Sequence, residues 1–252
     1  MTRYKVVLEY DGTDLIGWQE NAQGPSVQSI LRDAIFSFCG ERPDVVGAGR
    51  TDAGVHALGM VAHFDLEKET DAETVMRALN FYLVNQPVSV LNCEIVADDF
   101  NARFDCCARH YKYVVLNRGP QPVLNKSRVW WVPRKLNITA MKRAAEKLVG
   151  KHDFTSFRAS ECQAKSPIKT LDSVTITKNG DEIVFEFSAR SFLHHQVRNM
   201  VGTLVEIGAG KPYDIDEVLT AKNRSVAGPT APASGLFFVS ADYANGDADS
   251  DK

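Results

Sequence analysis

The chain has 252 residues, of which 44% are hydrophobic and 24% charged, and this is long enough for one large domain or two fused small ones. No apolar run approaches the roughly 20 residues that cross a bilayer, and the opening MTRYKVVLEY lacks the layout of a signal peptide. We therefore expect a cytoplasmic protein without a membrane segment. The five cysteines form no C-x-x-C pair, which favours reduced thiols over a disulfide or zinc framework.

The net charge of −3 is unevenly distributed along the chain. Residues 1–102 carry 7 Lys/Arg against 16 Asp/Glu, and residues 152–252 carry 10 against 14, whereas residues 103–151 carry 12 against 2. An uneven solvated surface is one explanation. The basic segment also contains Tyr111, Tyr113, Trp130 and Trp131, and cations mixed with aromatic rings favour binding of a polyanion.

The first half of the chain alternates strand and helix patterns. Alternating apolar residues predict a strand from Tyr4 to Tyr10, and helical spacing predicts a helix over 27–39 with Gly40 just past its end. A strand over 57–66, a short helix over 72–83 and a strand over 88–97 follow.

The same alternation recurs in the second half. We expect a strand over 109–117, a helix over 138–150, a hairpin over 173–190 that turns at Asn179-Gly180, a helix over 194–208 and a last strand over 235–243. The pattern predicts an α+β protein whose two similar halves, 1–104 and 105–243, share one large mixed, mostly antiparallel sheet flanked by helices. The small acidic tail, 244–252, is expected to be disordered.

The glycine-rich stretch GAGRTDAGVHALG, residues 47–59, sets Arg50 and Asp52 among flexible residues. Gly49 and Gly54 have the spacing of a phosphate loop, but the lysine that should follow is absent, and the dinucleotide-binding pattern also fails. The sequence thus contains no motif for a nucleotide cofactor. Asp52 either caps backbone amides in a turn or serves as a functional carboxylate, and this stretch alone leaves both open.

The stretch SFLHHQVRNMVGTL, residues 191–204, predicts an amphipathic helix with His194 and Arg198 beside its apolar stripe. Zinc binding by His194 and His195 is disfavoured, because neighbouring helical positions point about 100° apart and no third ligand is suitably spaced. Arg198 next to an apolar surface is suited to hold a partly buried carboxylate in its ionised form.

Taken together, GRTDAGVHA, RHYKY, FLHHQVRNMVG and APASGLFF resemble the tRNA pseudouridine synthases of the TruA type. The resemblance extends to YDGTDLIGWQ and HDFTSF and so spans nearly the whole chain. It implies two ferredoxin-like halves, a homodimer, no cofactor or metal, and isomerisation of uridine to pseudouridine at positions 38, 39 and 40 of the tRNA anticodon stem-loop. Glu20 stands where family members often carry a basic residue, so contact of this loop with RNA stays open.

The resemblance also implies the site residues. Asp52 matches the essential aspartate and Arg198 the basic residue that pairs with it. Arg50 matches the arginine that displaces the target base, Tyr111 the tyrosine that stacks on the extruded uracil, and Leu236 an apolar contact to the base. The carboxylate either adds to C1′ or removes the 2′ proton, and both mechanisms stay open.

Two other classes of function compete with this interpretation. A non-catalytic RNA-binding module would account for the basic segment but not for Asp52 and Arg198 in matching motifs. A hydrolase acting on a glycoside would need a second catalytic carboxylate as its acid, and no neighbouring motif supplies one. We therefore expect an isomerase, and we expect His56 to be structural rather than a general base.

Overall fold

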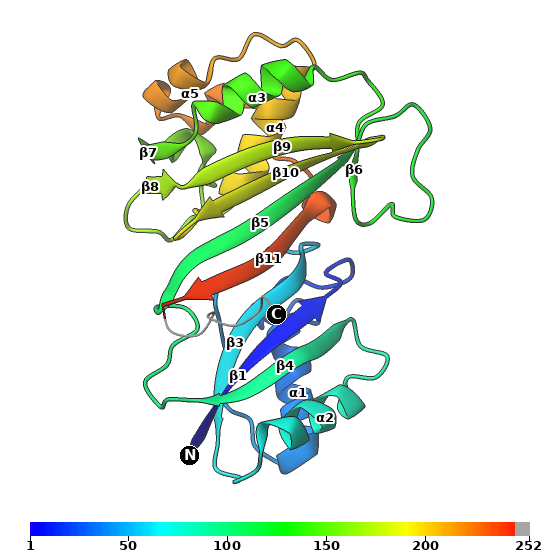
Figure 1. Ribbon diagram of the computed structural model, residues 1–252, viewed down its shortest axis with the longest axis vertical. Helices are drawn as coiled ribbons and strands as arrows, with labels where there is room; N and C mark the ends of the chain where they lie inside the picture. The colour runs from blue at the N-terminus through cyan, green and yellow to red at the C-terminus, as the bar shows by residue number, and fades with distance from the viewer. Residues whose placement is uncertain (245–252) are drawn as a thin grey trace, which may run out of the picture. The chain divides into compact units, whose positions relative to one another are not determined.

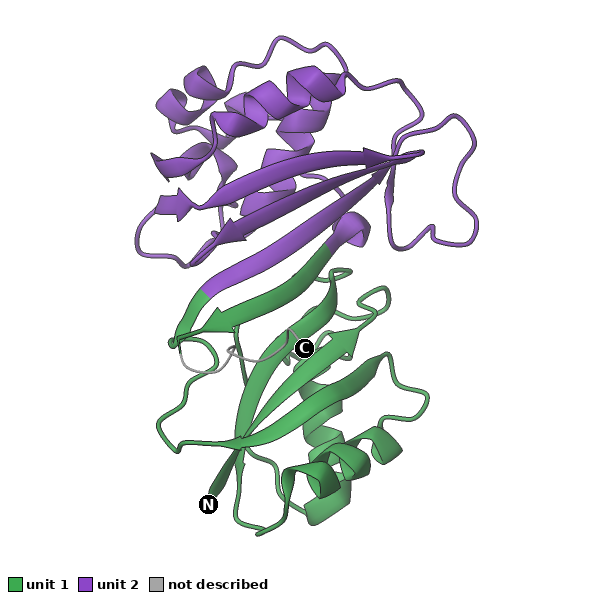
Figure 2. Ribbon diagram, viewed as in Figure 1, with its two compact units in different colours: residues 1–107, 237–252 green, residues 108–236 purple. Residues whose placement is uncertain are grey.

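The computed structural model describes residues 1–244, so the expected disordered tail, 244–252, lies outside the described residues except for Ala244. The chain folds into two compact units (Figure 2). Unit 1 comprises residues 1–107 and the segment from residue 237 onward, and unit 2 comprises residues 108–236.

Unit 1 is built on antiparallel strands that are far apart in the sequence. β1 (Thr2–Tyr10) pairs on one side with β3 (His56–Leu66) and on the other with β4 (Val88–Val96). The short β2 (Val46–Gly47) is antiparallel to β3, while β11 (Leu236–Tyr243) runs parallel to it. Every second residue of β1 from position 4 to 10 is buried, as the alternation predicts: Tyr4, Val6, Leu8 and Tyr10.

Two amphipathic helices complete unit 1 (Figure 1). α1 (Val27–Cys39) begins with a capping box formed by Ser26 and Ser29, and it ends where Gly40 adopts a left-handed conformation. α2 (Ala72–Tyr82) is capped by the side chain of Asp71 and packs against β4. These helices confirm the helical spacing of both segments and the expected end of α1 at Gly40.

Unit 2 contains β5 (Cys106–Leu116, from residue 108 onward), β10 (Glu182–Ala189) and β9 (Ser173–Asn179), paired antiparallel in that order. The β9–β10 hairpin turns through Gly180, whose φ of 59° explains the predicted turn. β6 (Trp130–Trp131) adds a short parallel strand beside β5. The sequence did not predict the separate pair formed by β7 (Gly150–Asp153) and β8 (Ile168–Leu171).

Three helices belong to unit 2: α3 (Ile138–Glu146), α4 (Gln196–Gly208) and α5 (Ile215–Ala221). The predicted helix over 138–150 was wrong in its last turn, because the chain leaves the helix after Glu146 and enters β7 at Gly150, where φ is 108°. α5, capped by Asp214, was not predicted. Short 3-10 turns lie at Thr155–Phe157 (η1), before α4, and at Arg224–Val226 (η2) and Ala233–Gly235 (η3), after α5.

The fold class is confirmed: residues 1–244 form an α+β protein with a mixed, mostly antiparallel sheet of nine strands and five flanking α-helices. The division into ferredoxin-like halves, 1–104 and 105–243, stays a prediction. The two compact units divide after residue 107, and residues from 237 onward belong to unit 1 again. Within the described part of the chain, no helix has the length and apolar character needed to cross a membrane.

Candidate active site

The loop that carries Asp52 joins β2 to β3 in unit 1, and an early segment of the chain holds it by backbone pairing. Asp52 forms an isolated antiparallel bridge with Gly17. The carbonyl of Thr51 accepts the N–H of Trp18 at 3.0 Å, and the N–H of Gly54 donates to the carbonyl of Leu15 at 3.3 Å. The YDGTDLIGW stretch therefore holds the loop by backbone pairing on both sides of Asp52.

The side chains around the loop restrict it further. The hydroxyls of Tyr10 and Thr51 lie 2.8 Å apart in a buried hydrogen bond. His56 is buried at the start of β3, and its ring stacks on Phe237 with the centroids 4.8 Å apart. Arg50, two residues before Asp52, is exposed. The loop is thus anchored at Thr51 by a buried hydrogen bond, whereas the neighbouring Arg50 is exposed.

The Nδ1 atom of His56 lies 3.1 Å from the N–H of Gly12 and 3.1 Å from a carboxylate oxygen of Asp11. A neutral imidazole with its proton on Nε2 accepts the N–H of Gly12, whereas a protonated ring donates to Asp11. In both forms His56 joins the Asp11-Gly12 turn to the start of β3. This position fits the structural role expected for His56.

Unit 2 presents Tyr111 on β5. Tyr111 is paired with Phe187 of β10, and its ring meets Phe192 edge to face with the centroids 5.1 Å apart. Only 9% of Tyr111 is exposed. Because residues two apart on a strand share a face, Tyr111 and Tyr113 lie on the same side of β5.

Leu236 enters β11 directly after a turn that packs on Tyr113. The hydroxyl of Tyr113 donates to the carbonyl of Pro232 at 2.7 Å, and a Cβ on Gly235 would lie 2.6 Å from the tyrosine ring. Burial raises the pKa of Tyr113, and the positive charge of Arg198 opposes this rise. In unit 2, Arg198 and the turn before Leu236 therefore both lie near Tyr113. Tyr111 is on the same face of β5.

Arg198 lies in the first turn of α4. Its Nε donates to the carbonyl of Ala231 at 2.8 Å, so the backbone of unit 2 holds the guanidinium. The prediction that the helix begins at residue 194 was wrong. α4 begins at Gln196, and His195 stands before it with a φ of 62°, a conformation that costs a non-glycine residue free energy.

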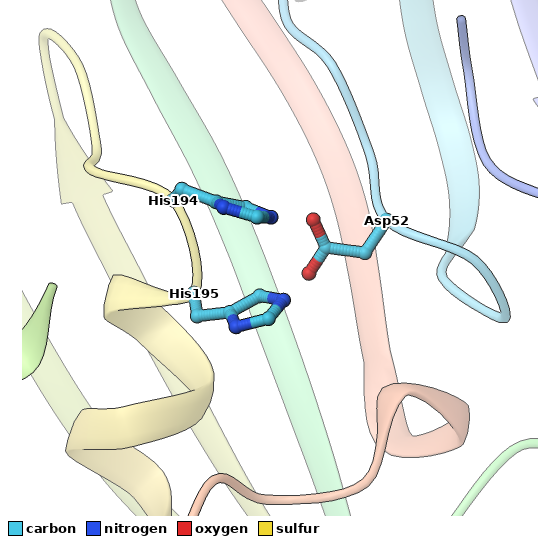
Figure 3. A group of neighbouring side chains, drawn as sticks. All are labelled: Asp52, His194 and His195. Carbon is cyan, nitrogen blue, oxygen red and sulfur yellow. The ribbon is translucent and has the colours of Figure 1, made fainter. Parts of the chain in front are cut away.

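The two histidines lie outside the helix, and their rings approach with the centroids 4.0 Å apart. The argument that neighbouring helical positions separate them was therefore wrong. Figure 3 draws them with Asp52, which comes from the β2–β3 loop of unit 1, whereas both histidines come from the segment before α4 in unit 2. Carboxylate and imidazole are groups that ligate metal ions. The expectation of a metal-free site stays a prediction.

The two units differ sharply in charge. By sequence, unit 2 contains 20 Lys/Arg and 11 Asp/Glu, whereas unit 1 contains 9 and 21. Several cations of the basic segment have carboxylate partners: Arg118 with Asp181, Arg134 with Glu206, and Lys147 with Asp214 and Asp216. The excess of positive charge in unit 2 comes from the basic segment, because residues 108–151 carry 11 Lys/Arg and 1 Asp/Glu, whereas residues 152–236 carry 9 and 10.

Sequence comparison identifies relatives of this chain. The family model described as tRNA pseudouridine synthase matches residues 6–105 and 144–244. The tRNA pseudouridine synthase A of Rhodospirillum centenum is 54% identical over 245 residues, which cover 96% of this chain and 100% of the relative. The corresponding proteins of Rhodopseudomonas palustris and Bartonella bacilliformis are 52% and 49% identical, again over 96% of this chain and 100% of theirs. The chain belongs to the tRNA pseudouridine synthase family.

Proposed function

We propose that this protein is an isomerase that converts uridine to pseudouridine in tRNA. The observation that carries the proposal is identity of 49–54% to proteins named tRNA pseudouridine synthase A, along 96% of the chain. As the resemblance implies, the targets are positions 38, 39 and 40 of the anticodon stem-loop. The bond from N1 to C1′ breaks and a bond from C5 to C1′ forms, C5 loses a proton and N1 gains one, so no external group and no redox cofactor is consumed.

Asp52 is the catalytic carboxylate in this proposal. It either adds to C1′ or removes the 2′ proton, and in both cases it must be ionised and fixed in direction. Backbone pairing of its loop with Gly17 and Trp18 supports such a role, since a carboxylate on a held loop needs little reorganisation when the substrate arrives.

The other residues prepare the base for reaction. Arg198 pairs with the carboxylate, and its bond to Ala231 supports this by limiting the orientations of the guanidinium. Tyr111 stacks on the extruded uracil and Leu236 contacts it. Arg50, which is exposed, fills the space that the base leaves. Together they offset an unstacking cost of a few kcal/mol.

Substrate affinity arises mainly from unit 2 in this proposal, because its 20 Lys/Arg exceed its 11 Asp/Glu and neutralise phosphates of the tRNA. Affinity then falls steeply as salt is raised. We further propose a homodimer in the cytoplasm, in line with the family resemblance.

The test is release of tritium from tRNA whose uridines carry tritium at C5. The wild-type protein should release it with the RNA chain intact. Asp52→Asn should bind tRNA with unchanged Kd but release none, because the amide keeps the shape and loses the charge. Asp44→Asn, which alters an exposed carboxylate of the same unit, is the matched control and should behave as wild type.

Each rival function predicts another result. Binding without tritium release by the wild type would indicate a non-catalytic RNA-binding module, and loss of the base or strand would indicate a hydrolase. Turnover near wild type by Asp52→Asn, in a sample cleared of host enzyme, would remove Asp52 from the proposed mechanism.

A further inference from the structure

The segment of residues 224–231, RSVAGPTA, packs backbone to backbone along the first half of α4. The N–H of Gly228 donates to the buried hydroxyl of Thr203 at 2.9 Å. A Cβ on Gly202 would lie 2.9 Å from the carbonyl carbon of Pro229 and closer still to its oxygen, so only glycine permits this approach. The segment is therefore seated on the helix that carries Arg198.

Arg224 fastens this segment through its guanidinium, whose partners are neutral. One terminal nitrogen donates to the carbonyl of Gly228 at 2.9 Å. The other donates to Oδ1 of Asn199 at 3.1 Å and to the hydroxyl of Thr230 at 3.0 Å. Burial lowers the pKa of Arg224. Removing the Arg224 guanidinium from water costs free energy. We therefore take the role of its N–H donors to be holding the segment in one arrangement rather than adding charge to the surface.

Asn199 connects the network to α4. It is fully buried, and its Oδ1 accepts the hydroxyl of Thr230 at 2.7 Å as well as the bond from Arg224. Its Nδ2 donates to the carbonyl of Phe157 at 2.8 Å. A buried polar network whose members satisfy one another in this way fixes a single geometry.

The network ends at Ala231, next to Thr230, and Ala231 makes two bonds to Arg198. Its N–H donates to the backbone carbonyl of Arg198 at 3.1 Å, and its carbonyl accepts Nε of the same arginine at 2.8 Å. Because the Nε–H bond lies in the plane of the guanidinium, this contact sets the plane of the whole group.

We infer that Asn199, Arg224 and Thr230 are positioning residues for the isomerisation. Acting through Ala231, they hold the Arg198 guanidinium in the orientation in which it meets the catalytic carboxylate. This inference rests on the proposed function, in which Arg198 is the partner of Asp52. It predicts that the network affects turnover and leaves tRNA binding unchanged.

The first test is Thr230→Val, which keeps the shape of the side chain and removes the hydroxyl that bridges Asn199 and Arg224. The kcat for tritium release should fall about tenfold, since small misplacements of a positioned group cost one to two powers of ten, while Kd for tRNA stays within about twofold. Thr230→Ser should restore most of the loss. Ser225→Ala is the matched control, because its exposed hydroxyl lies in the same segment but bonds to Asn223, outside the network.

The second test reads the geometry without activity. In protein labelled with nitrogen-15 at arginine, the Nε–H of Arg198 should exchange slowly with solvent in the wild type and in Thr230→Ser, and faster in Thr230→Val. Unchanged kcat or unchanged exchange in Thr230→Val would overturn the inference, as would a loss of kcat that serine does not restore. A wild type that releases no tritium would instead contradict the proposed function, and the exchange measurement would still test how Arg198 is held.

Discussion

Replacing Gly12 by alanine tests how closely the loop of Asp52 must be held. A Cβ at this position would lie 2.7 Å from the carbonyl carbon of Val55 and closer still to its oxygen, whereas ordinary contact begins at 3.4 Å. Val55 donates its N–H to the carbonyl of Asp52 at 3.2 Å. The added methyl must therefore push the end of this loop away by roughly 1 Å, a displacement that typically costs about 100-fold in rate.

Such a loss corresponds to about 2.7 kcal/mol of transition-state stabilisation, because each factor of ten is 1.36 kcal/mol. We expect single-turnover tritium release by Gly12→Ala to slow by about this factor. Overpacking should also lower the free energy of unfolding by about 1–3 kcal/mol. The Kd for tRNA should change little, because the phosphates are bound mainly by unit 2 in the proposed function.

The control is Gly119→Ala, since a Cβ at Gly119 would meet nothing within 4 Å. This variant should match the wild type in melting temperature, Kd and rate. If Gly12→Ala binds tRNA normally and retains the wild-type rate, the close approach of Gly12 to Val55 does not position Asp52, and the reasoning fails.

Three further predictions concern single side chains. Arg198→Met should reduce kcat severely because the carboxylate loses the charge that keeps it ionised and oriented, and Arg198→Lys should be milder; equal losses in the two variants would indicate a purely geometric role. Tyr111→Phe should keep the Kd for tRNA because its stacking face survives, and full activity would confine Tyr111 to stacking. Burial lowers the pKa of His63 below its ordinary 6.5; the charge of Arg3 lowers it further, and Asp65 and Asp105 oppose the shift. As the pH falls below 6.5, the unfolded chain therefore binds a proton more readily than the folded chain does. The free energy of unfolding should therefore drop on acidification, by at most about 1.4 kcal/mol per pH unit. His63→Asn keeps an acceptor for the N–H of Ala102 and should reduce this dependence of stability on pH, measured by urea unfolding at several pH values. An unchanged dependence would show that other groups cause the loss.

The sequence by itself determined the elements whose signals are local. The alternation in β1, the terminal glycine of α1, and the Asn179-Gly180 turn all depend on short-range geometry, and each is found where it was predicted. The motif residues around Asp52 and Arg198 also sufficed to identify the family, because four such motifs in order are specific. The unpredicted α5 and the β7–β8 pair are short, and their stability depends on neighbours distant in sequence.

Only the tertiary structure decided how the site residues are supported. No local pattern couples Gly12 to Val55, or Arg224 to Asn199, since each pair meets through contacts 25 or more residues apart in the chain. Folding likewise decided that Lys147 is paired with Asp214 and Asp216, which a count of charges by segment does not show. A sequence displays the chemical groups that a reaction uses, but their orientation depends on long-range packing and on buried hydrogen bonds, which exist only once the chain has folded.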